Sequence, residues 1–555
     1  MVFFDFKQAR REVEAEGVYI GGWGIKEAII PRKYGDASQD RAEEVNAVKD
    51  WSEAEERRLV RKLDLRVLFP CCIVYFLAYL DRANMGYAST MQSKRPDNIN
   101  VNLGLVGAQF NWAVSVTYFS VTALLLPSNL LMKKISGKRY FPIIMVLFGT
   151  VVCTIAATKN AAGLLAGRFF LGIPEAGVVS TCLLYFSFWY KPSERALRLG
   201  IFHAANSLAS GVGGFLAVGV DRLNGVAGLE SWRWLFLIEG LMPIVMSVPV
   251  YFMLLTFPED SKALSERERH IAINRFGRGA TRRTDATWSW PVFWQVITRP
   301  STQVFFVAYV CVLIVATALG TFLPVIFNNF LDFSSTKSNV YTSAIYFVAL
   351  AEYYLWSLHS DATRDRMWHY LFPIIIAIPC FAVWTHVSIN QSYGSIKPIA
   401  LYGLAFLGKS VSICQPAALA YRSATLYGAT EQAVGGAVAV ASLSVGSIIG
   451  PQIFPHADAP WYLPGFAASL ATLSLTLILY ASLPFWYLWE AQRRKRKYGH
   501  AMPLKALEDA GRAMTSEAAR LQEQERQVLE EKGLGGDVET ARHVEEVVEG
   551  GKEKR

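Results

Sequence analysis

The sequence predicts an all-α polytopic membrane protein with about twelve membrane-spanning helices in two six-helix halves. Of its 555 residues, 52% are hydrophobic and only 18% are charged, whereas charged residues make up roughly 25% of an ordinary soluble domain. The mean hydropathy of +0.25 over the whole chain is hard to accommodate in a water-soluble core. Long apolar runs separated by short basic clusters are typical of membrane helices and the loops between them.

The composition argues against several other classes of protein. The net charge of +9 does not indicate a nucleic-acid partner, because the Lys and Arg residues are not gathered into one face or domain. All seven cysteines lie in apolar runs without metal-ligand spacing, so we expect small buried side chains and no metal site. The sequence has no motif of an ATPase, a zinc protease or a serine hydrolase. We therefore expect no enzymatic activity, no catalytic residue and no cofactor.

Apolar runs of about 20 residues, the length that crosses a bilayer, predict the spans and divide the chain. A first half is expected at 64–257 and a second at 301–490, joined by a polar cytosolic loop at 258–300. Residues 1–63 and 491–555 are expected to be charged cytosolic tails. The spans are predicted at 66–88, 107–131, 139–158, 163–188, 198–220, 233–256, 302–328, 340–358, 369–388, 396–421, 431–454 and 463–489.

The distribution of basic residues predicts the orientation of the chain in the membrane. Lys and Arg concentrate before the first span, between the second and third, after the fourth and eighth, and after the twelfth. The alternate loops carry fewer basic residues. Because cytosolic loops carry the excess of Lys and Arg, both termini are expected to be cytosolic.

The two halves repeat one pattern of residues. Ser193-Glu194-Arg195-Ala196 opens the fifth span, and Thr430-Glu431-Gln432-Ala433 opens the eleventh. At the same offset, matching small residues follow in both spans: Ala204 and Ala441, Ser207 and Ser444, Ser210 and Ser447, and Gly213 and Gly450. The pattern favours two related halves, with chance similarity of small-residue helices as the alternative.

Four charged residues are expected inside the membrane. Asp81 and Arg82 lie in the first span, and Arg168 and Glu175 lie on one face of the fourth. Placing one charged side chain at the centre of a membrane helix costs about 2.5–3.5 kcal/mol on insertion scales. We therefore expect each of these residues to have a structural or functional role. The four residues form either a structural salt-bridge cluster or a proton-and-anion site. In the second case an Arg fork holds a carboxylate, and a buried Glu loads and releases a proton.

Other polar residues in the spans are weaker candidates. His203 either titrates near neutral pH or packs as a neutral side chain, and Lys409 either attracts an anion or pairs within the helices. Glu239 is expected to brace helix packing. Pro174 and Pro416 are expected to kink their spans. Six further side chains are candidates for lining a central cavity: Tyr118, Asn328, Asn329, Glu352, Tyr353 and Gln415.

Six segments of the first half resemble, in order and spacing, the anion:cation symporter family of the major facilitator superfamily, whose fungal members include allantoate, nicotinate and pantothenate permeases. They are LDRANMGYAS, PSNLLMKKISGKRYFP, GRFFLGIPEAGVVS, FWYKPSERALRLGIFHAANSLASGVGG, SWRWLFLIEGLMP and LTFPEDSKALSERER. The resemblance extends over about residues 60–497. It implies the major facilitator fold and proton-coupled movement of organic anions through a cavity between the halves.

The resemblance also implies roles for individual residues. Relatives with the Asp-Arg pair use the Arg for the anion and membrane acids for protons, which implies a substrate role for Arg82 and a proton-coupling role for Asp81, Arg168 and Glu175. Arg168 and Gly172 resemble the Arg-xxx-Gly motif of the fourth helix. The loop MKKISGKRY lacks the Asp of the usual cytosolic gate. Two residues of the symmetric loop after the eighth span are the alternative gating pair: Asp361 and Arg364.

These observations predict a secondary transporter of the plasma membrane. It is expected to take up a small organic anion of the carboxylate, vitamin or ureide type together with protons, by alternating access of the two halves. We expect a monomer in the lipid bilayer, whose partners are the anionic substrate and protons. Two alternatives remain: an exporter of a small metabolite, and a nutrient sensor or receptor that does not transport.

Overall fold

The computed structural model describes residues 9–10, 12–14, 50–93, 95–275, 290–363, 365–426, 429–498 and 501, and no strand occurs among them. Two compact units are present in the chain. One comprises Met1–Val18 with Glu490–Arg555, and the other is Tyr19–Trp489. The second unit contains the helices that build the site.

Every range predicted as a span is helical. In the first half the helices are α5 (Phe69–Thr90), α7 (Gln109–Ile135), α8 (Gly137–Ile155), α9 (Ala161–Glu175), α10 (Val178–Trp189), α11 (Pro192–Asp221) and α12 (Ser231–Met253). In the second half they are α15 (Pro300–Asn329), α16 (Ser335–Thr363), α17 (Met367–Asn390), α18 (Pro398–Lys409), α19 (Cys414–Ala424), α20 (Ala429–Ile449) and α21 (Leu463–Tyr498). Shorter helices lie outside these ranges: α4 (Glu53–Leu63), α6 (Ile99–Asn102), α13 (Glu266–Asn274) and α14 (Trp290–Ile297).

Nine helices within the described ranges are long and apolar enough to cross a membrane, or ten when the bent α7 counts as one span. The two other predicted ranges are helical but less regular. The eighth is α16, a helix rich in Ser, Thr and Tyr, and the tenth is divided into α18 and α19. Length and hydropathy alone therefore identify fewer spans than the predicted twelve.

The fourth and tenth spans break where proline residues lie within them, as predicted. Pro174 precedes the end of α9 at Glu175, and α10 begins at Val178. In the tenth span, a 3₁₀ turn at Ser410–Ile413 separates α18 from α19, which carries Pro416 in its first turn. Proline removes a backbone donor and clashes with the preceding turn, so both prolines lie next to an interruption of the α-helix.

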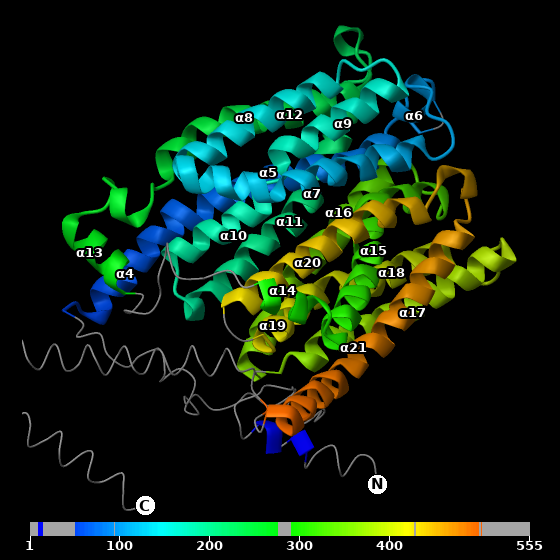
Figure 1. Ribbon diagram of the computed structural model, residues 1–555. Coiled ribbons are helices and arrows are strands. Elements are labelled where there is room, and N and C mark those ends of the chain that lie inside the picture. Colours follow the sequence, from blue (N-terminus) through cyan, green and yellow to red (C-terminus); the bar gives the residue numbers. More distant parts are fainter. Residues whose placement is uncertain are drawn as a thin grey trace, which may run out of the picture. The chain divides into compact units, whose positions relative to one another are not determined.

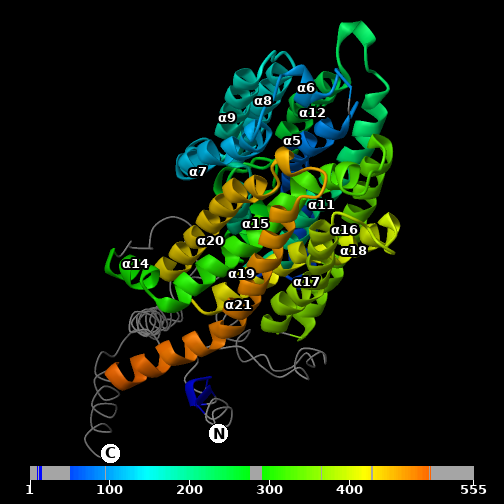
Figure 2. The same cartoon turned by 90° about the vertical axis from the view of Figure 1, so that its right-hand side faces the viewer.

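The helices form two groups, α5 with α7–α12 and α15–α21, which lie side by side (Figures 1 and 2). The groups touch mainly through α5 with α15, α11 with α16, and α7 with α20. Glycines allow the closest approaches: a Cβ added at Gly86 would overlap the carbonyl oxygen of Thr321, and one at Gly214 would overlap Oγ of Ser343. Small residues permit such backbone contacts in a bilayer, where the hydrophobic drive for association is weak.

Hydrogen bonds connect the two halves at one end of the bundle, which we call the joined end. The bonds involve the C-terminal end of α5 and the N-terminal end of α7. They are Thr90 Oγ1 to Asn339 Oδ1 at 2.8 Å, Ser93 Oγ to Asn328 Oδ1 at 2.8 Å, Asn111 Nδ2 to the Phe454 oxygen at 3.0 Å, and Ser115 Oγ to the Ile448 oxygen at 2.8 Å.

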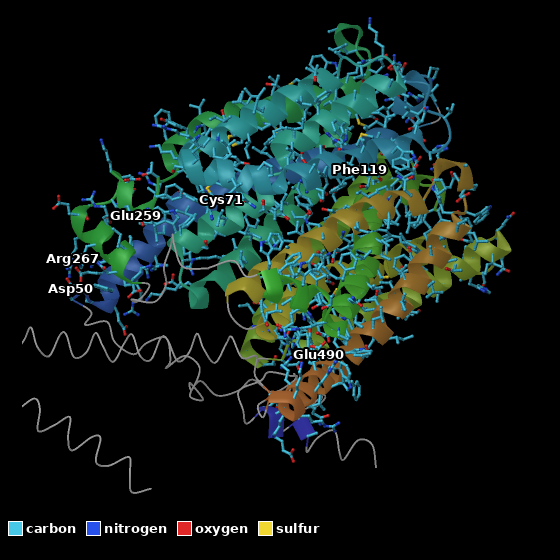
Figure 3. The ribbon with its side chains drawn as sticks, viewed as in Figure 1. Asp50, Cys71, Phe119, Glu259, Arg267 and Glu490 are labelled. Atoms are coloured by element: carbon cyan, nitrogen blue, oxygen red, sulfur yellow. The ribbon has the colours of Figure 1, made fainter. Side chains whose placement is uncertain are left out.

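At the opposite end of the first half, α13 docks on α4. Lys62 Nζ donates to both carboxylate oxygens of Glu268, at 2.7 and 3.0 Å, and Arg267 pairs with Asp50 at 2.9 Å (Figure 3). Burial raises the pKa of Glu268, but hydrogen bonds from Lys62 and from the backbone of Ser265 outweigh this effect. The pKa of Glu268 therefore lies below its usual value, which means that the folded state favours the charged carboxylate.

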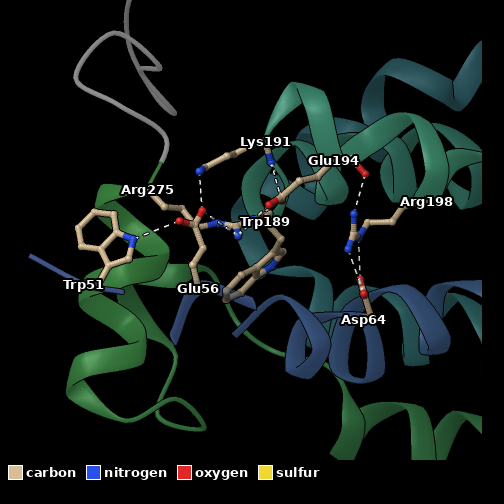
Figure 4. A network of polar contacts seen from close by, with 8 residues as sticks. All are labelled: Trp51, Glu56, Asp64, Trp189, Lys191, Glu194, Arg198 and Arg275. Atoms are coloured by element: carbon tan, nitrogen blue, oxygen red, sulfur yellow. Dashed lines mark hydrogen bonds and ion pairs between the residues drawn. The ribbon is translucent and has the colours of Figure 1, made fainter. Parts of the chain in front are cut away.

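A second network at this end fixes the start of α11 (Figure 4). Arg198 holds Asp64 through Nε at 2.7 Å and Nη2 at 3.0 Å, a two-point contact that suits the planar guanidinium. Arg275 pairs with Glu194 at 2.5 Å. In the second half, Glu431 of the repeated pattern pairs with Arg299, directly before α15, at 2.6 Å. Both copies of the repeated Glu thus form ion pairs near the same end of the bundle.

Candidate functional site

The four charged residues predicted within the spans meet between α5 and α9. Arg82 Nε donates to Glu175 Oε2 at 2.8 Å, and Arg168 Nη1 donates to Asp81 Oδ2 at 3.4 Å. Each helix contributes one acid and one base, and each pair joins the two helices. The charges therefore compensate one another in pairs, which lowers the cost of placing them in the membrane.

Close packing of α9 against α7 sets the position of these residues. A Cβ at Gly172 would overlap the carbonyl oxygen of Thr117, so only glycine permits this approach. Thr117 Oγ1 donates to the Arg168 oxygen at 2.9 Å, and Ser120 Oγ donates to the Phe169 oxygen at 2.7 Å. The glycine of the Arg-xxx-Gly motif thus allows the backbones of α7 and α9 to come into contact, and this contact positions Arg168.

The two ion pairs differ in access to solvent. The side chains of Arg168 and Asp81 are 2% and 3% exposed, and Arg168 Nε also donates to the Ala113 oxygen at 3.3 Å. This pair is enclosed by helices. Arg82 is 14% exposed, whereas its partner Glu175 is fully buried. Arg82 is therefore the member of the cluster that a solute can reach.

Arg82 engages the protein through only one of its three nitrogens. Its Nε binds Glu175, and neither terminal nitrogen has a hydrogen-bond partner in the part of the chain that the structure describes. The rings of Tyr79 and Tyr118 flank the guanidinium, with centroids 5.2 and 5.8 Å from its Cζ. Aromatic faces stabilise a cation without occupying its donors, so the terminal nitrogens remain available to a ligand.

A cavity lies between the two halves. Six residues predicted for the site line it, whereas Glu352 does not: Arg82, Tyr118, Arg168, Tyr353, Lys409 and Gln415. Lys409 comes from the second half and is the last residue of α18, at the break in the tenth span. Its Nζ lies 4.5 Å from the ring centroid of Tyr346, and no acidic side chain pairs with it within the described ranges.

Three further predicted residues lie away from this cavity. Asn328 Nδ2 donates to the Phe333 oxygen at 2.8 Å, and Asn329 Nδ2 donates to Tyr462 Oη at 2.7 Å. Both asparagines bind groups near the end of α15 and do not line this cavity, so their role in substrate binding stays a prediction. His203 contacts the rings of neighbouring aromatic residues, with centroids 6.0 Å from Tyr75 and 5.6 Å from Phe202. This environment favours the packing alternative for His203.

The predicted gating pair lies outside the described residues, since neither Arg364 nor the side chain of Asp361 is described. The described side chains contain no group of three or more His, Cys, Asp or Glu that could hold a metal ion. The cavity is thus defined by Arg, Lys, Tyr and small polar side chains.

Sequence reasoning missed several lining residues, including Tyr79, Asn206, Tyr346 and Ser412. Tyr79 precedes Arg82 by three residues and therefore shares its helix face, a signal that was available. Asn206 is a polar residue in the middle of a span, which was also a usable signal. Tyr346 and Ser412 could not be found, because the rotation of α16 and of the broken tenth span follows from packing.

A bundle of membrane-length helices in two groups around a central cavity is typical of a class of membrane transporter. The family model described as Major Facilitator Superfamily matches residues 71–451, and the chain belongs to this family. It is 27% identical to an uncharacterized transporter of Schizosaccharomyces pombe, over 80% of this chain and 85% of that protein. It is also 27% identical to a putative tartrate transporter of Agrobacterium vitis, over 72% of this chain and 88% of that protein.

A solved structure shares the fold. It is a bacterial homolog to the human lysosomal transporter Spinster, with a TM-score of 0.57, 14% identity, and coverage of 78% of this chain and 97% of that chain. The predicted major facilitator fold is confirmed. The protein is a multi-pass membrane transporter.

Proposed function

We propose that this protein takes up a small organic anion together with protons across the plasma membrane, as a member of the anion:cation symporter family. The observation that carries the proposal is Arg82, which lines the cavity and whose two terminal nitrogens have no hydrogen-bond partner among the described residues. A carboxylate accepts two parallel hydrogen bonds from such a fork. Arg82 is therefore the proposed anchor of the anion.

The cavity offers a second cation on the opposite half. Lys409 lines the same space as Arg82 and has no acidic partner among the described side chains. A substrate with two acidic groups, or with one acid and one polar acceptor, can engage both halves at once. The putative tartrate transporter among the relatives is named for such a dicarboxylate, which supports this substrate class.

Proton coupling follows from competition for Arg82. Glu175 and the substrate carboxylate are both acceptors for the same guanidinium, and Glu175 already holds its Nε. A proton on Glu175 removes that competing charge and strengthens the attraction between Arg82 and the anion. By linkage, the bound anion then promotes protonation of Glu175 to the same extent.

The proposal is tested in reconstituted vesicles with labelled tartrate as the first probe, followed by vitamins and ureides. We expect accumulation against a gradient when the outer solution is acidic, and loss of accumulation with a protonophore. Net loss of preloaded substrate down the same proton gradient would indicate an exporter, and binding without flux would indicate a sensor. Either result would overturn the proposal.

Glu175→Gln tests the coupling step, because Gln imitates the protonated acid and cannot release a proton. We expect pH-driven accumulation to disappear and exchange of labelled for unlabelled substrate to survive. Glu352→Gln is the matched control, since Glu352 is a carboxyl of α16 that does not line the cavity. Loss of both activities in Glu175→Gln would instead favour the structural salt-bridge interpretation.

A further inference from the structure

Glu239 on α12 is a further acidic residue within the predicted spans of the first half, and it lies buried without a hydrogen-bond partner among the described residues. The residue is 3% exposed, and neither carboxylate oxygen has a donor among the described atoms. A buried carboxylate without a donor or a cation is one of the most costly arrangements in a protein. Helix packing alone does not account for it, because an apolar side chain would pack without that cost.

The groups around Glu239 come from neighbouring helices. From α5, Asn84 and Asp81 are neighbours of Glu239, and Asp81 acts on it electrostatically, as does Arg168 of α9. Tyr87 of α5 is the other titratable group on that side, and its hydroxyl donates to the Ser210 oxygen of α11 at 2.6 Å. From α8, Cys153 contacts α12 through the Leu237 oxygen at 3.8 Å. Arg168 is the one cation among these groups.

The charges of this cluster do not balance. The cluster contains three acids, Asp81, Glu175 and Glu239, but two bases, Arg82 and Arg168. Both bases are already engaged, Arg82 by Glu175 and Arg168 by Asp81. An ionised Glu239 would be a third carboxylate with no cation of its own and with Asp81 as a like-charged neighbour.

We propose that Glu239 holds a proton in this conformation and forms a second proton site of the transporter, linked to Asp81 through Asn84. Asn84 Nδ2 donates to Asp81 Oδ1 at 2.9 Å, while Asn84 Oδ1 has no partner among the described residues. A protonated Glu239 supplies the missing donor to that oxygen. One proton thus satisfies two otherwise unpartnered groups and makes the cluster electrically neutral.

The site deepens the proposed coupling and rests on it for its role in transport. Release of the proton from Glu239 leaves an anion that needs a cation, and Arg168 becomes available when Asp81 takes up a proton. The proton that binds Asp81 then replaces the proton that leaves Glu239, and Arg168 exchanges one carboxylate for the other. The number of protons in the cluster is conserved, and the ion pair moves from α5 to α12.

Infrared spectroscopy of the purified full-length protein at neutral pH tests the protonation state directly. We expect a carbonyl stretching band of a protonated carboxylic acid that is lost in Glu239→Gln and kept in Glu352→Gln. In Asn84→Ala the band should shift, because the acid loses its acceptor. An unchanged spectrum in Glu239→Gln would show a carboxylate solvated by other means and would overturn the proposal.

Transport assays test the role of the site. We expect Glu239→Gln to lose pH-driven accumulation and to keep exchange, while Glu239→Asp keeps the carboxylic acid band and part of the accumulation. Unchanged accumulation in Glu239→Gln would remove Glu239 from coupling. If the parent protein shows no proton-driven uptake, the proposed function fails, whereas the infrared band still decides whether Glu239 holds a proton.

Discussion

The side chain of Arg82 is fixed by one contact with the protein and still has donors that can bind a substrate. Its Nε is bound to a fully buried carboxylate, which fixes the plane of the guanidinium. The side chain lines the cavity, and two tyrosine rings flank its guanidinium. Such a fork is pre-oriented before the substrate arrives, so little side-chain entropy is lost on binding.

Arg82→Lys should lower transport strongly although the charge is kept. Lysine is a point donor that cannot bind Glu175 and two carboxylate oxygens in one plane. The loss of one charge-assisted hydrogen bond costs about 1.5–3 kcal/mol, which corresponds to roughly a tenfold to hundredfold weaker affinity. The measurement is the concentration dependence of uptake, normalised to surface-labelled protein.

Arg66→Lys is the control for that substitution, because Arg66 makes a single hydrogen bond to the Phe252 oxygen, at 3.1 Å, which lysine can also make. Wild-type affinity in Arg82→Lys would show that Arg82 does not anchor the anion through two points.

At the residue scale, the sequence revealed the charged residues but not their surroundings. Asp81, Arg82, Arg168 and Glu175 stand out because charges inside apolar runs are rare, and the structure brings all four together. The rotation of α5 and α9 about their axes determines which of the two ion pairs lies at the cavity. This rotation cannot be predicted from any single residue. For the same reason Glu239, expected only to brace packing, could not be recognised as unpaired.

At the scale of the element, we expect the stability of the docked helix α13 to depend on pH through the carboxylate of Glu268. The pKa of Glu268 is depressed in the folded state, so its contribution is complete above the usual pKa of a Glu and is lost as the pH falls through the depressed value. We expect the amides of α13 to exchange hydrogen faster, after correction for intrinsic rates, as the pH is lowered through that range.

The comparison of two neighbouring glutamates separates this effect from general acid unfolding. Glu268→Gln should remove the pH dependence and leave α13 less protected at neutral pH. Glu266→Gln, in the same first turn, should leave the pH dependence unchanged. Equal behaviour of the two variants would show that the contact with Lys62 does not hold α13.

Element positions could be predicted well because the apolar length required by a bilayer is a strong constraint. The breaks near Pro174 and Pro416 were also predictable from the loss of a backbone donor. The 3₁₀ turn at Ser410–Ile413 and the five-residue π-helix Asp64–Leu68 were not, since these variants depend on the neighbouring helices.

At the scale of the molecule, Gly86 controls how closely the two halves approach. A side chain there would overlap the Thr321 carbonyl oxygen of the other half, so Gly86→Ala should destabilise the conformation with the joined end closed. Overpacking costs about 1–3 kcal/mol, a shift of roughly fivefold to a hundredfold in the equilibrium.

A cysteine introduced at Ala316, a cavity residue, reports this shift in a cysteine-free background. An impermeant thiol reagent added from the joined-end side should label it faster in Gly86→Ala. Gly219→Ala is the control, because a Cβ at Gly219 meets no atom within 4 Å. Equal labelling in both variants would contradict a role for Gly86 in closure.

The predicted topology places both termini in the cytosol, and it is tested with reporter tags. Tags at either end should be accessible only after the cell membrane is permeabilised. The prediction rests on the basic residues before the first span and after the twelfth. A terminus found outside the cell would require an odd number of spans.

Lys409, which has no acidic partner among the described side chains, gives the empty cavity an electrical property. With Arg82 and Arg168 balanced by two carboxylates and Glu239 neutral, Lys409 leaves one excess positive charge in the empty carrier. Because the proposed cycle also loads a proton onto Glu175, a dianion is needed to cancel that charge. An elementary charge moved across 100 mV corresponds to about 2.3 kcal/mol. In the proposed cycle the membrane voltage therefore acts on the return of the empty carrier and leaves the carrier loaded with a dianion and one proton unaffected, so the resting potential of the cell sets the speed at which the cycle restarts.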